Sequence, residues 1–248
     1  MPHFTSRDGI AIYYDDQGDG APVVLLHGYV GDSNVDWVRS GIFDRLLDEG
    51  FRVVLYDARG HGLSDKPHDV ASYAGDMLAN DTRTLLDELG FTACVLVGFS
   101  LGARTALRVA SLDDRITAVV ALGLGETSLQ KHRGNNLVSE AMEAEDPKSI
   151  EHAGVRRFRR MADAIGADRE ALAAVMYAER PEVPTYADAV KVPVLVIAGS
   201  DDESAGSPDP LAAALPDGRG ITTAGDHAGV KDQAAAQEAM IAFLTEHA

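Results

Sequence analysis

Short apolar stretches alternate with longer amphipathic stretches along most of the chain. Apolar runs of strand length predict strands at residues 10–14, 22–26, 51–56, 93–97, 116–122, 192–198 and 220–223, the first of them followed by a turn-rich segment at 15–20. Apolar residues at helical spacing predict helices at residues 37–48, 73–89, 101–111 and 231–246. Apolar strands separated by helices indicate an α/β fold with a mostly parallel central sheet covered by helices on both faces.

The alternation stops between residues 123 and 190, where only helical patterns are found, at 149–164 and 169–178. We interpret residues 125–186 as a short helical cap inserted over the strand ends. Residues 1–124 and 187–248 then form the core domain. The alternative is that the inserted helices are two ordinary crossover connections.

Composition narrows the possible partners. The chain has 248 residues, 46% of them apolar, which is enough for one large globular domain. It has no apolar run long enough to cross a membrane and no signal-peptide pattern at its start, so we expect a cytoplasmic protein. The net charge of −17 disfavours binding to nucleic acid or to a membrane surface. We therefore expect a small-molecule partner; the sequence does not specify the oligomeric state.

Metal and cofactor patterns are absent from the sequence. Cys94 is the single cysteine and lies in the predicted strand at 93–97, where it is expected to pack as a small apolar residue. The Gly123-Leu124-Gly125 segment lacks the third glycine of a dinucleotide-binding turn, and neither a Walker loop nor a metal-ligand cluster is found. We predict no cofactor and no metal.

One serine stands between two glycines where a predicted strand gives way to a predicted helix. Gly98-Phe99-Ser100-Leu101-Gly102 matches the G-x-S-x-G nucleophile elbow in the strand–helix context that this motif requires. Such a turn raises Ser100 above the carboxyl ends of the strands, where open α/β sheets bind ligands. The alternative role, capping the helix, does not require glycine on both sides.

A serine hydroxyl needs a base to become a nucleophile, and in elbow hydrolases an acid and then a histidine follow the serine along the chain. Four histidines follow Ser100, and they are His132, His152, His227 and His247. His227 lies in a glycine-flanked loop between the last predicted strand and the last predicted helix, where the base is expected.

The acid is expected after the strand at 192–198. Asp201, Asp202 and Glu203 stand there side by side, and Glu126 is a fourth candidate, just past the strand at 116–122. The chemistry of the residues leaves this choice open.

These segments together resemble the α/β-hydrolase superfamily, in its group of small capped esterases, cofactor-free haloperoxidases and carbon–carbon bond hydrolases. The resemblance rests on His27-Gly28, on the segment at 57–64, on the elbow, on the strand that ends at Gly199 and on the His227 loop.

The resemblance implies further site residues. It implies Asp202 as the acid, because the acid usually stands three residues after the glycine that closes its strand. It also implies an oxyanion hole made by the backbone N–H groups of Tyr29 and Leu101. His27 and the segment at 57–64 are expected to be structural.

The chain departs from the family pattern in three places. Ala103 stands where a second elbow glycine is common, and Val30 and Gly31 stand where haloperoxidases often carry proline. Asp226 precedes His227 in place of a glycine, and its charge is expected to raise the pKa of the histidine.

The sequence therefore predicts a serine hydrolase that cleaves a small neutral or apolar carboxylic ester through an acyl-enzyme. Ser100 attacks, His227 moves the proton and Asp202 orients the imidazole. One alternative is hydrolysis of a carbon–carbon bond in a β-diketone or ring-cleavage product by the same triad. Another is a ligand receptor on a hydrolase fold with little turnover. Four apolar residues of the inserted segment are expected to line the pocket roof, namely Met142, Phe158, Met161 and Met176.

Overall fold

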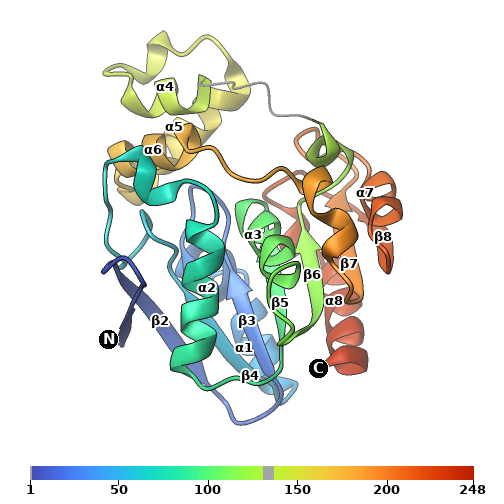
Figure 1. The fold of residues 1–248 in the computed structure, drawn as a ribbon. Helices are drawn as coiled ribbons and strands as arrows, with labels where there is room; N and C mark the ends of the chain where they lie inside the picture. Colours follow the sequence, from blue (N-terminus) through green and yellow to red (C-terminus); the bar gives the residue numbers. More distant parts are fainter. Residues whose placement is uncertain (1, 131–136) are drawn as a thin grey trace.

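The computed structural model describes residues 2–130 and 137–248 and contains one eight-stranded sheet with the order β1-β2-β4-β3-β5-β6-β7-β8 (Figure 1). The first two strands run antiparallel to their neighbours, and the strands from β4 to β8 are parallel. The strands are β1 (His3–Thr5), β2 (Ala11–Gln17), β3 (Pro22–Leu26), β4 (Arg52–Tyr56), β5 (Cys94–Phe99), β6 (Ile116–Leu122), β7 (Val194–Gly199) and β8 (Gly218–Thr223). The predicted α/β fold with a mostly parallel sheet is confirmed.

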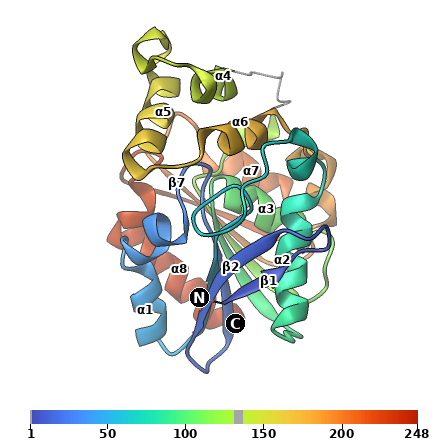
Figure 2. The same ribbon diagram turned by 90° about the vertical axis from the view of Figure 1, so that its left-hand side faces the viewer.

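Helices cover both faces of the sheet, as Figure 2 shows. Because successive side chains of a strand point to opposite faces, Val24 and Leu26 of β3 pack with α2 and α3, whereas Val23 and Leu25 pack with α1 and α8. The core helices are α1 (Ile42–Asp48), α2 (Met77–Glu88), α3 (Leu101–Ala110), α7 (Pro208–Ala214) and α8 (Ala234–His247). Continuous apolar runs such as that of β3 are thus explained by burial on both sides.

Between β6 and β7 the described residues form helices and no strand. They are α4 (Leu137–Glu143), α5 (Ala153–Ile165) and α6 (Arg169–Tyr177), and they lie beyond the carboxyl ends of the strands (Figures 1 and 2). Their apolar faces form a cluster of their own that also includes Tyr29, Tyr73 and Leu101 of the core. We continue to interpret residues 125–186 as a cap.

Short helical turns connect these elements. They are η1 (Asn34–Val38), η2 (Val70–Tyr73), η3 (Glu126–Leu129), η4 (Pro147–Ser149), η5 (Val183–Thr185), η6 (Ala187–Ala189) and η7 (Val230–Asp232). In the described part of the chain, none of the helices has both the length and the apolar character needed to span a bilayer.

The predicted end of the strand at 10–14 is wrong. The segment after residue 14 is not yet a turn, because β2 continues to Gln17 and pairs Asp15 and Asp16 with Leu55 and Val54 of β4. The Asp16 carboxylate binds the Arg52 guanidinium at 2.6 and 2.9 Å, so this polar end of the strand is held by an ion pair across the sheet.

Candidate active site

The turn at Ser100 explains why glycine stands on both sides of it. Ser100 has φ 53° and ψ −110°, and it is the one non-glycine residue with positive φ in the described chain. A Cβ on Gly98 would lie 2.5 Å from the Ala103 backbone, and a Cβ on Gly102 would lie 2.1 Å from the Leu26 carbonyl oxygen. The strained backbone at Ser100 is thus held by packing that tolerates no side chain on either flank.

The structure brings Ser100, His227 and Asp202 together from three separate loops. His227 Nε2 lies 2.9 Å from Ser100 Oγ, and His227 Nδ1 lies 2.8 Å from Asp202 Oδ2. With the Nδ1 proton donated to the carboxylate, Nε2 is left to accept the serine proton. The Asp202 side chain is 0% exposed and that of His227 is 19% exposed, so this row of three hydrogen-bonded side chains is buried at Asp202 and reaches solvent at His227.

The orientation of Asp202 is set by its own turn. The backbone N–H groups of Ser204 and Ala205 both donate to Oδ1 at 3.0 Å, which leaves Oδ2 for the imidazole. Of the four carboxylates that the sequence leaves open, Asp202 alone contacts His227; the other three, Asp201, Glu203 and Glu126, are exposed.

The acid loop and the base loop meet backbone to backbone. A Cβ on Gly199, at the end of β7, would lie 2.1 Å from the carbonyl oxygen of Gly225 in the His227 loop. The glycine that closes the strand is therefore required for the two loops to come this close.

The predicted oxyanion donors are backbone N–H groups in two different loops. Leu101 is the first residue of α3, and the N–H of such a residue has no partner inside its helix. Tyr29 follows β3 and is 7% exposed. Within the described residues neither N–H donates a hydrogen bond to the protein, although buried N–H groups are nearly always paired. Both N–H groups are therefore free to donate to a bound ligand.

His27 and His61 hold the turn that carries the Tyr29 N–H. His27 Nδ1 lies 2.7 Å from the Gly28 carbonyl oxygen, and its Nε2 accepts from the Ala58 N–H at 2.9 Å. His61 Nε2 contacts the Tyr29 carbonyl oxygen. Burial lowers the pKa of His61 to about 4, so the ring is neutral near neutral pH. These contacts support the structural role that the family resemblance implies for both histidines.

Sequence reasoning missed a buried ion pair, between Asp36 and Lys231, that connects two loops of the site. The Asp36 carboxylate accepts from the Gly28 N–H at 2.8 Å and lies 3.4 Å from Lys231 Nζ, which also donates to the Ala228 carbonyl oxygen at 2.9 Å. The pair thus links the turn before Tyr29 to the loop that carries His227. Its partners are 195 positions apart in the numbering, 36 against 231, so no local pattern indicates it.

Asp226, the unusual neighbour of His227, is engaged elsewhere. Its carboxylate accepts from the Gly229 N–H at 2.8 Å and from Arg157 of α5 at 2.9 Å. These contacts, the Gly229 N–H foremost, lower the pKa of Asp226. A partly exposed ion pair therefore connects the inserted helices to the base loop.

A cavity of about 420 Å³ opens beside the site, between the loops after β3 and β4 and the α5–α6 turn. Ser100 and His227 do not line it. Four carboxylates do, namely Asp15, Asp32, Asp57 and Asp168. Each of them already accepts a hydrogen bond from a backbone N–H group. Because neither Ser100 nor His227 lines it, this acidic cavity is separate from the triad.

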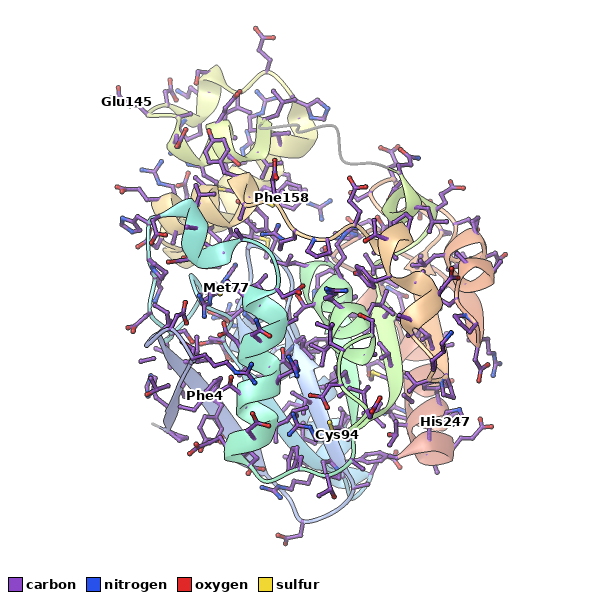
Figure 3. The ribbon with its side chains drawn as sticks, in the orientation of Figure 1. Phe4, Met77, Cys94, Glu145, Phe158 and His247 are labelled. Carbon is purple, nitrogen blue, oxygen red and sulfur yellow. The ribbon has the colours of Figure 1, made fainter. Side chains whose placement is uncertain are left out.

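Three histidines and the cysteine lie away from the triad or outside the described residues. His152 caps α5 through its Nδ1, 3.4 Å from the Val155 N–H, and His247 ends α8, whereas His132 lies outside the described residues. Cys94 is buried at the start of β5 (Figure 3), and burial raises the pKa of its thiol to about 12. Among the described residues, no group of His, Cys, Asp and Glu is placed to hold a metal ion.

Comparison with known proteins agrees with the fold. A family model described as alpha/beta hydrolase fold matches residues 21–148, just over half of the chain. Among curated proteins, a putative non-heme chloroperoxidase of Synechocystis is 43% identical over 114 residues, which are 44% of this chain and 39% of that protein. A bifunctional esterase/perhydrolase of Acinetobacter calcoaceticus is 40% identical over 106 residues, 41% of this chain and 36% of that protein. The chain thus spans about two fifths of the length of these relatives.

Solved structures match over nearly the whole chain. A thermophilic esterase from Thermogutta terrifontis has a TM-score of 0.79 at 26% identity, with 100% of this chain and 99% of that chain covered. A bromoperoxidase from Bacillus anthracis has a TM-score of 0.74 at 25% identity, with 98% and 100% covered. The protein therefore belongs to the alpha/beta hydrolase fold family, and the proteins similar to it include some that are named haloperoxidases.

Proposed function

We propose that the protein is a serine hydrolase that cleaves carboxylic esters through an acyl-enzyme. The observation that carries the proposal is the continuous relay from Ser100 Oγ to His227 Nε2 at 2.9 Å and from His227 Nδ1 to Asp202 Oδ2 at 2.8 Å. The esterase names of several relatives support the same reaction class.

In the first half of the reaction, Ser100 Oγ attacks the ester carbonyl carbon while its proton passes to His227 Nε2. The carbonyl oxygen gains the negative charge and accepts hydrogen bonds from the Tyr29 and Leu101 N–H groups. When the tetrahedral intermediate collapses, the bond to the alcohol oxygen breaks and that oxygen takes the proton from His227. Ser100 is left acylated and the alcohol departs.

Water then repeats the steps on the acyl-enzyme. His227 removes a proton from the water, the hydroxide oxygen attacks the acyl carbon, and Ser100 Oγ leaves with that proton while the carboxylic acid is released. Asp202 keeps its charge throughout and stabilises the imidazolium that forms twice in the cycle. Because its side chain is buried, this stabilisation is little screened by water.

The inserted helices support an apolar roof over part of the site. Phe158 and Met161 of α5 and Met176 of α6 are partly buried and pack in one cluster with Tyr29 and Leu101, whereas Met142 is 1% exposed. We propose that the three partly buried side chains contact the apolar part of a small substrate and that Met142 is core.

The test is ester turnover with and without the nucleophile. We expect wild-type protein to hydrolyse p-nitrophenyl acetate and butyrate, and Ser100→Ala to lower kcat by roughly a millionfold. Ser111→Ala, at the far end of the same helix, is the matched control and keeps full turnover. A fluorophosphonate probe is expected to label Ser100, as peptide mass spectrometry will show. Labelling that survives in Ser100→Ala contradicts the proposal, and tight ligand binding without turnover favours a receptor.

Perhydrolysis is a second candidate because relatives carry the names chloroperoxidase and esterase/perhydrolase. In that reaction hydrogen peroxide replaces water on the acyl-enzyme and a peracid leaves. Bromination of monochlorodimedone in acetate, peroxide and bromide measures it, and the signal must disappear in Ser100→Ala. Turnover of a β-diketone, measured in parallel, tests carbon–carbon bond hydrolysis.

A further inference from the structure

Two partly buried arginines, one of them on the helix that follows Ser100, have no carboxylate partner. Arg104 and Arg180 take part in none of the ion pairs formed by the described residues, and residues 131–136, outside that description, include no Asp or Glu. Six other buried or partly buried arginines are paired with a carboxylate, namely in Arg52–Asp16, Arg59–Asp81, Arg83–Asp113, Arg108–Asp76, Arg115–Asp113 and Arg159–Asp163. Arg45 and Arg156 are also partly buried and form no ion pair with a described residue. Among the described arginines without a carboxylate partner, Arg104 and Arg180 are the two whose pKa is lowered by burial.

Arg104 lies one helical turn after the nucleophile. Its backbone N–H donates to the Ser100 carbonyl oxygen at 3.1 Å, and it shares a face of α3 with Leu101, three residues earlier. Because side chains on a helix lean toward its N-terminus, Arg104 is directed toward the edge of the sheet where Ser100 lies. Its guanidinium donates no hydrogen bond within the described residues.

Arg180 approaches the same place from the cap side. It follows α6, and its Nη1 donates to the Val175 carbonyl oxygen at 2.5 Å. Burial, and then repulsion from Arg104, lower the pKa of Arg180 to about 10, while attraction to the Tyr29 phenol acts in the opposite sense. Both guanidinium groups therefore stay charged near neutral pH and lie close enough to repel each other.

Two adjacent buried cations without an anion are unfavourable, and an anion that enters between them relieves both desolvation and repulsion. Guanidinium groups bind carboxylates with two parallel hydrogen bonds, so a carboxylate is the anion that fits them best. The four-residue step from Ser100 to Arg104 corresponds to a rise of about 6 Å along the helix, which a chain of a few bonds can span.

We propose that Arg104 and Arg180 form a subsite for a free carboxylate of the substrate, located a few bonds from the scissile ester carbonyl. The substrate class is then a half-ester of a short dicarboxylic acid or a lactone that bears a carboxylate. This inference rests on the proposed function, because Ser100 supplies the nucleophile, and it replaces the expectation of a neutral acyl compound.

The experiment compares two esters that differ in charge at the far end of the acyl chain, monomethyl glutarate and methyl pentanoate, with acid release measured near neutral pH. Wild-type protein is expected to prefer monomethyl glutarate in kcat/KM. Arg104→Gln and Arg180→Gln are each expected to reduce that preference by about ten- to a hundredfold, mainly through KM. Arg104→Lys, which keeps a charge but loses the fork, should recover part of it.

Arg108→Gln is the matched control, because Arg108 lies one turn further along α3 and is paired with Asp76 at 2.8 and 2.9 Å. It should leave the preference between the two esters unchanged. An equal preference in wild type, Arg104→Gln and Arg180→Gln overturns the subsite and leaves Arg180 as a structural cap on the α6 carbonyls.

A binding measurement separates this inference from the proposed function. Calorimetric titration of Ser100→Ala with glutarate should show binding that Arg104→Gln weakens, whereas the uncharged glutaramide should not bind. If glutarate does not bind, the subsite is wrong even where p-nitrophenyl butyrate turnover supports the esterase. If p-nitrophenyl butyrate is not turned over at all but glutarate still binds, the esterase proposal fails and the anion site stands. In wild-type protein, inhibition by glutarate and not by glutaramide gives the same answer if a glutamine variant does not fold.

Discussion

At the scale of single residues, the candidate site depends on which carboxyl oxygen faces which donor. Asp202 uses Oδ1 for two backbone N–H groups of its own turn and Oδ2 for His227. Its neighbour Asp201 is exposed and binds nothing in the base loop through its side chain, although its backbone N–H donates to the Gly225 carbonyl oxygen. Two identical side chains, one position apart, therefore have unrelated environments.

We expect Asp202→Asn to lower kcat by up to about ten-thousandfold, because the amide presents a donor to Nδ1 and so favours the wrong tautomer of His227. The two N–H contacts to Oδ1 are retained, so the thermal midpoint should stay close to that of wild type. Asp201→Asn is the control and should have little effect on p-nitrophenyl butyrate turnover. If Asp201→Asn proves to be the inactive variant, Asp202 does not orient the base.

Single residues also show which features of the site could be predicted from the sequence and which could not. Ser100, His227 and the segment around Asp202 lie in short local patterns and could be predicted from them. The choice of Asp202 over Asp201 and Glu203 rests on the family resemblance, because the residues themselves do not show the turn that follows β7. The roles of Arg104 and Arg180 depend on the absence of partners across the whole fold, which no local pattern contains.

At the scale of elements, the apolar runs predicted the strands that are buried on both faces. β1 was missed because three residues with one buried side chain carry no pattern, and its single buried residue, Phe4, packs at the sheet edge (Figure 3). α4 and α7 were missed because each has only seven residues and neither lies in a longer helical pattern like the one at 37–48 that indicated α1. Their positions are set by packing on neighbouring helices and strands.

Within the inserted helices, we expect partly buried side chains to affect substrate preference and fully buried side chains to affect stability. Phe158 of α5 is partly buried, its ring lies 6.0 Å from that of Tyr29 in an edge-on arrangement, and Figure 3 shows it on the side of the cap toward the core. Phe158→Ala should therefore shift the preference among p-nitrophenyl acetate, butyrate and octanoate toward longer chains. Met142→Ala should mainly lower the thermal midpoint, since Met142 is 1% exposed and large-to-small core changes cost about 2–5 kcal/mol. An unchanged preference with a large loss of stability in Phe158→Ala would make Phe158 a core residue.

At the scale of the whole molecule, stability is expected to depend on pH through His61. Its pKa is lowered by burial from 6.5 to about 4, so at pH values below 6.5 the unfolded chain binds a proton that the folded chain does not. Stability is therefore complete above pH 6.5 and declines as the pH falls toward 4, by up to about 3 kcal/mol from this group.

Urea unfolding of wild type at pH 7 and at pH 5 measures this loss. His61→Asn, which removes the titrating group, should be less stable at neutral pH and should lose less stability between the two pH values. An identical pH dependence in the two proteins would show that other groups cause the decline.

The way the inserted helices join the sheet has a consequence for how such a protein can diversify. β6 and β7 are direct neighbours, with Leu122 paired with Ile197, although all of α4, α5 and α6 lie between them in the chain. The excursion leaves the sheet and returns to the adjacent strand, so its length and sequence can change without moving either strand. With the proposed role of these helices as a cap, selection can exchange one substrate range for another by replacing this excursion, while the three loops that carry Ser100, Asp202 and His227 are inherited intact.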